Sequence, residues 1–168
     1  REVTALLTSL KIVIINFGSL EIMEHHPSRY CAFSFLGVTA PEGPFTDLGK
    51  LFRSNEINIQ NCIDPFYIED NGKKYLFWGS FHGIYGTELT DDGLSLKKGA
   101  PIEQIAGTAY EGTYIHKRDG YYYLFASIGR CCEGLKSTYT TVVGRSKNLF
   151  GLMLTRKGVQ CRIIIMRY

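Results

Sequence analysis

The sequence predicts an all-β protein made of successive blades of a β-propeller, and two observations lead to this prediction. First, the 168 residues include 18 glycines, 11 tyrosines and 10 phenylalanines, a composition typical of turns and half-buried strands, while helical periodicity is weak throughout. Second, residues 64–77 (DPFYIEDNGKKYLF) resemble residues 111–125 (EGTYIHKRDGYYYLF). Strand units that recur every 40 to 50 residues, roughly, are typical of propeller blades.

The two copies align at four places, with an offset of 47 residues at their start and 48 by the glycine of the turn. The aligned residues are Asp64 with Glu111, Tyr67-Ile68 with Tyr114-Ile115, Gly72 with Gly120, and Tyr75-Leu76-Phe77 with Tyr123-Leu124-Phe125. Each copy contains a strand, a polar turn (DNG or RDG) and a second aromatic strand, which predicts a β-hairpin.

A third strand follows each hairpin, at 84–94 (IYGTELTDDGL) and at 141–151 (TVVGRSKNLFG). Residues 37–48 (GVTAPEGPFTDL) have the same character and look like the end of an earlier copy. The alternative is a coincidence between two aromatic hairpins of a β-sandwich. The simultaneous match of the acidic start, the turn and the Tyr-Leu-Phe run favours the propeller.

Two carboxylates stand at the same position of successive copies. Taken alone, Asp64 or Glu111 is most simply a solvated loop acid. In a propeller, however, the first strand of each blade lines the central channel, so residues at the start of equivalent strands face one pocket. Two carboxylates in one partly dry cleft titrate at different pH values, which suits acid and base chemistry.

Three segments resemble glycoside hydrolase family 43, and most closely its endo-arabinanase-like and arabinofuranosidase-like members. These segments are APEGPFTDLG, NCIDPFYIEDNGKKYLFWGSFHGI and YEGTYIHKRDGYYYLFASIGRCCEGLKSTYTTVVGRS, within about residues 37–151. The resemblance implies a five-bladed β-propeller, of which this chain would hold about two to three blades. It also implies hydrolysis of α-L-arabinofuranosidic linkages in arabinan or related plant polysaccharides, with inversion at the anomeric carbon.

The resemblance assigns catalytic roles to the two carboxylates. Glu111 matches the general acid, and Asp64 matches the carboxylate that tunes the acid's pKa and orients it. The family's general base is an Asp about two repeats before Asp64, and one repeat back already reaches Phe17. We therefore expect the base to be missing, with Glu42 and Asp47 in an outer turn as poor substitutes, and we expect little hydrolysis by the isolated chain.

Substrate contacts are also implied by the resemblance. The sequence NCID resembles the family's arabinan-contacting NAID loop, and SFH resembles its SFW segment, with His82 in place of Trp. The implied substrate-binding residues are Asn61, Cys62, Ile63, Ser80, Phe81 and His82. For Phe81 core packing is the alternative, and for Trp78 core packing is preferred. Arg130, Ser137 and Tyr139 are further candidates for the pocket lining.

The two ends of the chain, 1–29 and 152–168, resemble no blade of the family. We interpret residues 1–168 as a single partial catalytic propeller domain, from a truncated or frame-shifted gene product. No CxxC pair exists, and His25, His26, His82 and His116 do not match the family's metal-site histidine. We expect no metal or cofactor in this chain, although calcium is expected in an intact family member.

The charge and hydropathy of the chain limit the classes of partner that it is expected to bind. The net charge of +3 comes from scattered residues, which argues against nucleic-acid binding, and the apolar stretch 5–18 is too short to span a membrane. No signal peptide is visible, yet the resemblance implies a secreted or periplasmic enzyme acting on arabinan or arabinoxylan oligosaccharides. The alternatives are a β-xylosidase or exo-arabinofuranosidase of the same fold, or a non-catalytic carbohydrate-binding propeller fragment. Cys131 and Cys132 form either a vicinal disulfide or, more simply, two partly buried thiols.

Overall fold

The computed structural model describes residues 11–18, 31–38, 44, 46–151 and 164–165, which form three antiparallel sheets. The first contains β1 (Lys11–Gly18), β2 (Cys31–Val38) and β3 (Thr46–Arg53). The second contains β4 (Phe66–Asp70), β5 (Lys73–Trp78), β6 (Ile84–Glu88) and β7 (Glu103–Ala106). The third contains β8 (Glu111–Arg118), β9 (Tyr121–Ile128), β10 (Thr140–Ser146) and β11 (Ile164–Ile165). Two short helical turns, α2 (Ser54–Ile57) and η1 (Gly134–Lys136), complete the described part.

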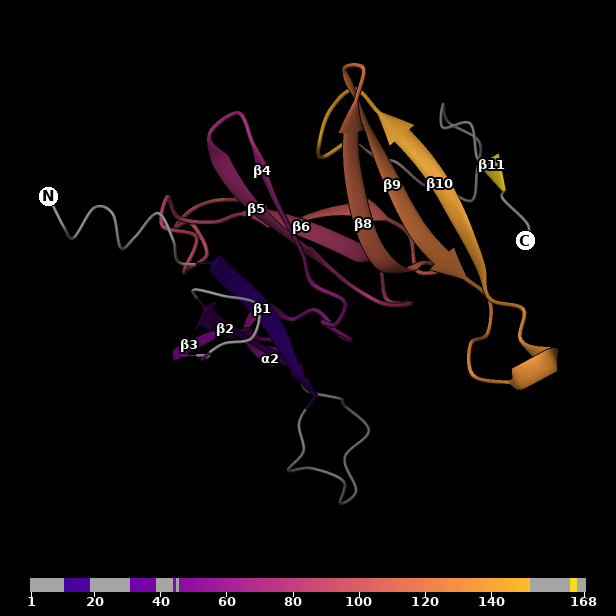
Figure 1. Cartoon of the computed structure of the whole chain (residues 1–168), viewed down its shortest axis with the longest axis horizontal. Helices are drawn as coiled ribbons and strands as arrows, with labels where there is room; N and C mark the ends of the chain where they lie inside the picture. Colours follow the sequence, from indigo (N-terminus) through magenta and orange to yellow (C-terminus); the bar gives the residue numbers. More distant parts are fainter. Residues whose placement is uncertain (1–10, 19–30, 39–43, 45, 152–163, 166–168) are drawn as a thin grey trace, which may run out of the picture.

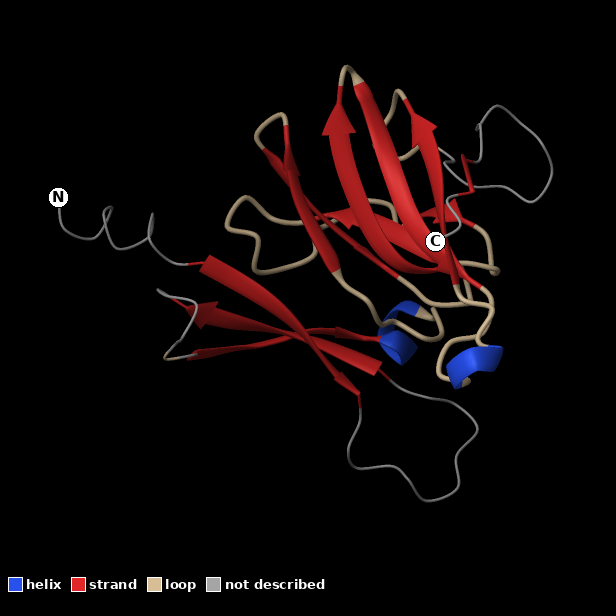
Figure 2. Ribbon diagram, turned by 45° about the vertical axis from the view of Figure 1, so that its right-hand side comes forward, coloured by secondary structure: helices blue, strands red, loops and turns tan. Residues whose placement is uncertain are grey.

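Strands that follow one another in the chain are neighbours in each sheet, and the sheets themselves follow one another in chain order (Figure 1). The view in Figure 2 shows the same succession, with strands dominating and helices confined to two short turns of the described residues. This arrangement confirms the predicted all-β architecture. The second and third sheets each have four strands, as the repeat of roughly 40 to 50 residues predicts for propeller blades.

The predicted turns are present in both hairpins. Asn71 and Gly72 connect β4 to β5 with φ angles of 50° and 76°, and Asp119 and Gly120 connect β8 to β9 with φ angles of 51° and 74°. A two-residue turn with positive φ at both positions is the I′ type, whose twist matches that of the flanking strands. Asn, Asp and Gly tolerate this conformation best, so the DNG and RDG signals were sound.

The register corrects part of the repeat alignment. Tyr67 pairs with Leu76, and Ile115 pairs with Leu124, so across the hairpins the offset is 48 residues and Tyr67 corresponds to Ile115. The predicted correspondence of Tyr67 with Tyr114 is therefore wrong. The extra residue is accommodated earlier, by a β-bulge between Glu111 and Tyr114, rather than near the turn.

Both faces of the middle sheet are buried, as expected for a blade between two neighbours. The cluster between the second and third sheets includes Phe77, Ile84, Ile105, Leu124 and Ala126. The cluster on the other face contains Phe52, Cys62, Leu76, Trp78 and Leu89. Successive residues of β5 thus point to opposite clusters, because side chains alternate along a strand. The preferred placement of Trp78 in the core is confirmed, with 0% of its surface exposed.

Polar contacts also connect the strands. Asp70, at the end of β4, accepts hydrogen bonds from Tyr122 of β9 (2.6 Å) and from Lys117 of β8. Burial acts to raise the pKa of Asp70, but these two donors outweigh it and lower that pKa. This carboxylate therefore links the second sheet to the third.

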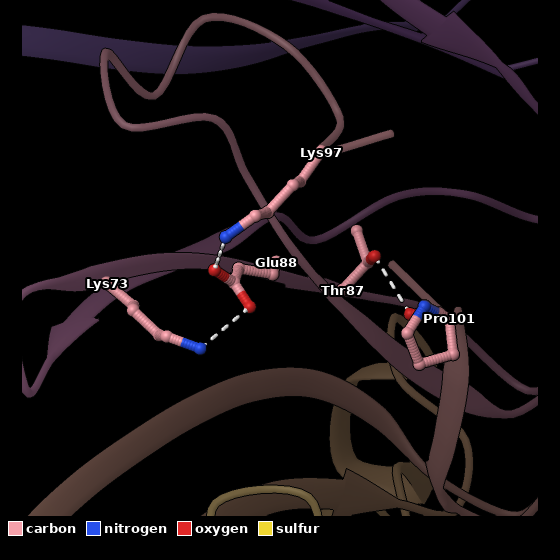
Figure 3. Close-up of polar contacts among 5 residues, drawn as sticks. All are labelled: Lys73, Thr87, Glu88, Lys97 and Pro101. Atoms are coloured by element: carbon pink, nitrogen blue, oxygen red, sulfur yellow. Dashed lines mark hydrogen bonds and ion pairs between the residues drawn. The ribbon is translucent and has the colours of Figure 1, made fainter. Parts of the chain in front are cut away.

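A second group of polar contacts fixes the long β6–β7 connection (Figure 3). Glu88 lies between Lys73 and Lys97, and the buried Thr87 donates a hydrogen bond of 2.9 Å to the carbonyl of Pro101. The connection is thereby held against the edge of the sheet, which allows β7 to pair with β6.

Candidate functional site

The site lies where the second and third sheets begin. Glu111 is the first residue of β8, and Asp64 stands two residues before β4. The Asp64 carboxylate oxygen Oδ2 accepts a hydrogen bond of 3.2 Å from the backbone N–H of Gly112, the residue after Glu111. The two carboxylates that the repeat places at equivalent positions are therefore brought together.

The β-bulge explains how one site uses both copies. Glu111 pairs with Ser127, and extending the β4–β5 register by two residues places Asp64 opposite Gly79, which is 48 residues before Ser127. The two acids thus occupy matching positions on their hairpins. Gly112, with a φ of 67°, lies in the bulge and directs its N–H to Asp64 instead of to a neighbouring strand.

Ser80 joins the end of β5 to the start of β8. Its hydroxyl donates a hydrogen bond of 2.7 Å to Oε2 of Glu111, and the two residues form an isolated antiparallel bridge. The side-chain amide of Asn61 donates to the carbonyl of Ser80 at 2.7 Å. Only 2% of Ser80 is exposed, so this residue contacts Glu111 rather than an open cleft surface.

Tyr139 approaches Glu111 from the segment between η1 and β10. Its hydroxyl lies near the carboxylate of Glu111 and the side chain of Ser127. Partial burial, together with the interaction with Glu111, raises the pKa of Tyr139 to about 12. The preceding loop is closed by Thr138, whose N–H donates to the carbonyl of Arg130 at 3.1 Å. Tyr139 therefore reaches the acid from a closed loop.

Left-handed backbone conformations are concentrated in the site. Asn61, Asp64 and Phe81 have φ angles of 54°, 56° and 51°. Asn and Asp tolerate this region, but an aromatic residue there is strained, and such strain clusters at functional sites. The N–H of His82 donates to the carbonyl of Ser80 at 2.8 Å, which closes a tight turn around Phe81.

This turn points Phe81 outward. The side chain is 38% exposed, and His82 beside it is also exposed. The alternative that placed Phe81 in the core is therefore wrong, and the two residues present an aromatic and an imidazole ring to solvent next to Ser80.

One predicted substrate contact is corrected. Cys62 is fully buried, and its thiol donates to the carbonyl of Ile59 at 3.2 Å, so it belongs to the core cluster with Trp78. Ile63 is half-buried against the same cluster, and its predicted contact with substrate stays a prediction.

Other expected positions differ as well. Asp47 lies within β3 and accepts from the N–H of Gly49 instead of standing in an outer turn, while Glu42, His25 and His26 lie outside the described residues. Cys131 and Cys132 are free thiols in contact with each other, and both are exposed rather than partly buried. The side chains of Arg130 and Ser137 make contacts within their own loop. Arg130 forms an ion pair with Glu133, and the hydroxyl of Ser137 donates a hydrogen bond to the carbonyl of Arg130.

The contacts of Ser80 and Tyr139 with Glu111 were missed by sequence reasoning. Ser127 had a usable signal, because the hairpin turn at Asp119-Gly120 fixes which residue of β9 lies opposite the start of β8. Nothing in the sequence near Tyr139 predicts that it approaches Glu111, because the shape of its loop depends on hydrogen bonds between residues eight positions apart.

Metal binding finds no support in the described residues. Within that part of the chain, no three His, Cys, Asp or Glu side chains are grouped so that they could hold an ion. His116 is an exposed residue of β8. The expectation that this chain holds no metal stays a prediction, and no chemical step is assigned to a metal. None of the described helices is long and apolar enough to cross a membrane.

Asp64 should make stability depend on pH. Burial raises the pKa of Asp64, and the charge of Glu111 adds to this, against the opposing hydrogen bond from Gly112. A raised folded-state pKa means that the folded chain binds this proton more tightly, so the stabilisation is complete below the unfolded pKa of about 3.9 and is lost as pH rises through the folded value. We expect Asp64→Asn to be the more stable protein at neutral pH, with an advantage that shrinks toward pH 3.

Urea unfolding at several pH values between 3 and 7 measures this difference. Asp92→Asn is the matched control, because hydrogen bonds from Thr90 and Leu94 lower the pKa of Asp92 and its substitution should destabilise neutral protein. A difference between Asp64→Asn and the unaltered chain that does not change with pH would contradict the assignment.

Comparison with known proteins places the chain among glycosidases. The family model described as Glycosyl hydrolases family 43 matches residues 24–161, a wider range than the 37–151 that carried the resemblance. The extracellular endo-α-(1→5)-L-arabinanase 1 of Bacillus subtilis is 37% identical over 123 residues, which are 69% of this chain and 38% of that protein. The extracellular exo-α-(1→5)-L-arabinofuranosidase ArbA of Cellvibrio japonicus is 31% identical over 140 residues, 73% of this chain and 40% of that protein.

Solved structures agree with the sequence relatives. An α-L-arabinanase of Cellvibrio cellulosa in complex with arabinohexaose has a TM-score of 0.74 at 26% identity, and the match covers 90% of this chain and 53% of that one. The native arabinanase of Bacillus subtilis also gives a TM-score of 0.74 at 26% identity, with coverage of 95% and 56%. The chain therefore spans about two-fifths of the length of these curated relatives and about half of these structures.

Proposed function

Because the chain belongs to glycosyl hydrolase family 43, as a partial five-bladed propeller, we propose that it carries the acid-donating part of an active site for α-L-arabinofuranosidic linkages. The contact of Asp64 with Gly112, directly beside Glu111, is the observation that carries this proposal. It supports a shared pocket for two carboxylates from successive blades, which is what the acid and its modulating partner require.

In the proposed reaction, Glu111 donates its proton to the glycosidic oxygen as the bond from that oxygen to the anomeric carbon breaks. Water attacks the opposite face of the sugar and gives a proton to a general base, so the configuration inverts. Asp64 supplies a second carboxylate beside the acid and orients it. We propose that the base is not among the residues of this chain. The chain should therefore bind arabinose oligomers but hydrolyse them little.

Phe81 and His82 are the proposed contacts for the sugar. Their exposed rings lie directly after Ser80, which touches Glu111, and aromatic faces pack against the apolar C–H surface of sugars while polar edges meet hydroxyls. The names of the relatives support arabinan oligosaccharides as the ligand, and a solved relative contains arabinohexaose. Because two relatives are named extracellular, we propose that the chain acts outside the cell.

A titration with α-(1→5)-linked arabinohexaose, followed calorimetrically, tests the proposal, with xylohexaose as the competing ligand. We expect saturable binding of the arabinose oligomer and a weaker response to the xylose oligomer. Phe81→Ala should weaken arabinohexaose binding by roughly 2- to 10-fold, the equivalent of an aromatic contact worth about 0.5–1.5 kcal/mol.

Tyr121→Ala is the matched control, because Tyr121 lies at the turn end of β9, away from Glu111. Equal affinity for both oligomers, or equal losses in the two variants, would overturn the arabinan assignment. If arabinohexaose binds without any hydrolysis, the chain acts as a carbohydrate-binding propeller fragment. Turnover would instead be sorted by its products, since free arabinose indicates exo attack, oligomers indicate endo attack, and xylose release indicates a xylosidase.

A further inference from the structure

The partners of the two carboxylates differ in kind. Glu111 accepts a hydrogen bond of 2.7 Å from the hydroxyl of Ser80, and the hydroxyl of Tyr139 lies near the same carboxylate. Asp64 is held by the backbone N–H of Gly112. An N–H group only donates, whereas a hydroxyl both donates and accepts. The hydroxyls can therefore hydrogen-bond Glu111 when it is ionised and, after rotation of an O–H, also when it is protonated.

This difference matters for a group that must release and regain a proton. A partner that only donates would hold the ionised carboxylate and lose its hydrogen bond when the acid is reprotonated. Hydroxyl partners keep the carboxyl group in one orientation through both states. A general acid loses rate quickly when it is misplaced, so a fixed orientation has a direct value for catalysis.

The hydroxyls are themselves fixed in position. Ser80 is buried, it is bridged to Glu111 through the backbone, and its carbonyl accepts from Asn61. The N–H of Phe81 donates to the carbonyl of Tyr110 at 2.9 Å, so a backbone hydrogen bond joins the two chain segments directly beside the Ser80–Glu111 bond. The hydroxyl of Tyr139 lies near Ser127, which pairs with Glu111 from the neighbouring strand β9.

We infer that Ser80 and Tyr139 are positioning residues that hold the Glu111 carboxyl group in one orientation in both its protonation states. The importance of this orientation for hydrolysis rests on the proposed function, but the orientation itself can be measured without substrate. In this arrangement, the blade before the acid and the loop after it each contribute one hydroxyl, and both act through Glu111.

Side-chain dynamics test this inference in the whole chain. With glutamate labelled by ¹³C and the Glu111 signal assigned through Glu111→Gln, relaxation of the Glu111 side chain should indicate a single ordered conformer. In Ser80→Ala and in Tyr139→Phe, the order parameter should fall toward the flexible range, below about 0.6. Ser95→Ala and Tyr123→Phe, which remove the same groups elsewhere, should leave it unchanged.

Each outcome decides the inference. Unchanged order of Glu111 in both variants, with the fold intact by thermal unfolding, would overturn it, and unchanged order in one variant removes that residue from the pair. Tyr139→Phe keeps the test open even if Ser80→Ala fails to fold, because Tyr139 is 42% exposed. If arabinohexaose does not bind, the proposed function fails while this readout still stands.

Kinetics provide a second readout where the chain turns over substrate. Loss of either hydroxyl should lower kcat on arabinose oligomers by roughly 10- to 100-fold with KM nearly unchanged. The loss should be much smaller on an aryl arabinofuranoside, whose phenolate leaving group needs little proton donation. Equal losses on both substrates would indicate a merely structural role and contradict the inference.

Discussion

In an intact enzyme, where a general base completes the site, Glu111→Gln should lower the turnover of arabinose oligomers by about 10²- to 10⁴-fold, the contribution typical of a general acid. Gln has nearly the same shape as Glu, and its side-chain carbonyl can still accept the hydrogen bond that Ser80 donates at 2.7 Å. The fold and the bound sugar should therefore be retained, so arabinohexaose affinity is expected to stay nearly constant. Only the transferable proton is lost.

The measurement compares initial rates on arabinohexaose and on a nitrophenyl arabinofuranoside, with binding followed in parallel. The aryl substrate should be affected far less, because its leaving group departs without a proton. Glu133→Gln, an exposed acid on the loop that precedes Tyr139, is the matched control and should change neither rate. Undiminished turnover of arabinohexaose in Glu111→Gln would remove Glu111 from the role of acid.

Trp78→Ala should have the largest effect on stability, with a loss of about 3–5 kcal/mol in the free energy of unfolding. Trp78 is fully buried, and its ring centroid lies 5.1 Å from that of Phe52, so truncation opens a cavity between the first and second sheets. A loss of this size approaches the whole stability of many domains, so the variant should be partly unfolded at 37 °C.

Urea unfolding followed by circular dichroism measures the effect. Phe81→Ala also truncates an aromatic ring of the same segment, but one that is partly exposed, and it should cost less than the buried ring. Because Trp78 is separated from Ser80 by one residue, a folded remnant of Trp78→Ala should also show a disordered Glu111 side chain. A loss below about 1 kcal/mol would contradict the assignment of Trp78 to the core.

Features that depend on residues close together in the chain could be predicted from the sequence. The turns at Asn71-Gly72 and Asp119-Gly120 were predictable because few residue types accept two successive positive φ angles. Once the hairpins are fixed, their first strands begin at matching places, and the meeting of Asp64 with Glu111 follows from the repeat. Alternation along β5 likewise placed Trp78 in the core.

The remaining features depend on contacts that no short segment encodes. The bulge at Gly112 shifts the register by one residue. A glycine does not by itself predict a bulge, because glycine also occurs in turns and other strand positions. The alignment of the first strand of the second copy was therefore wrong by one residue. The prediction of Cys62 as a substrate contact depends on neighbours that resemble a substrate-binding loop, but its side chain is fully buried in the core cluster with Trp78. The contact between Tyr139 and Glu111 depends on a loop closed by nonlocal hydrogen bonds.

The hydrogen bond from Gly112 to Asp64 means that the site exists only where two successive blades are neighbours. Neither repeat contains the site, because each supplies one acid and the second supplies the N–H that holds the acid of the first. A cut between β7 and β8, near the exposed Thr108 and Ala109, would place the two acids on separate fragments, whereas a cut at the Asp119-Gly120 turn would leave both acids on one fragment. Duplication of one blade thus creates a site where the two copies adjoin. The order of the two blades must be retained if the two acids are to meet.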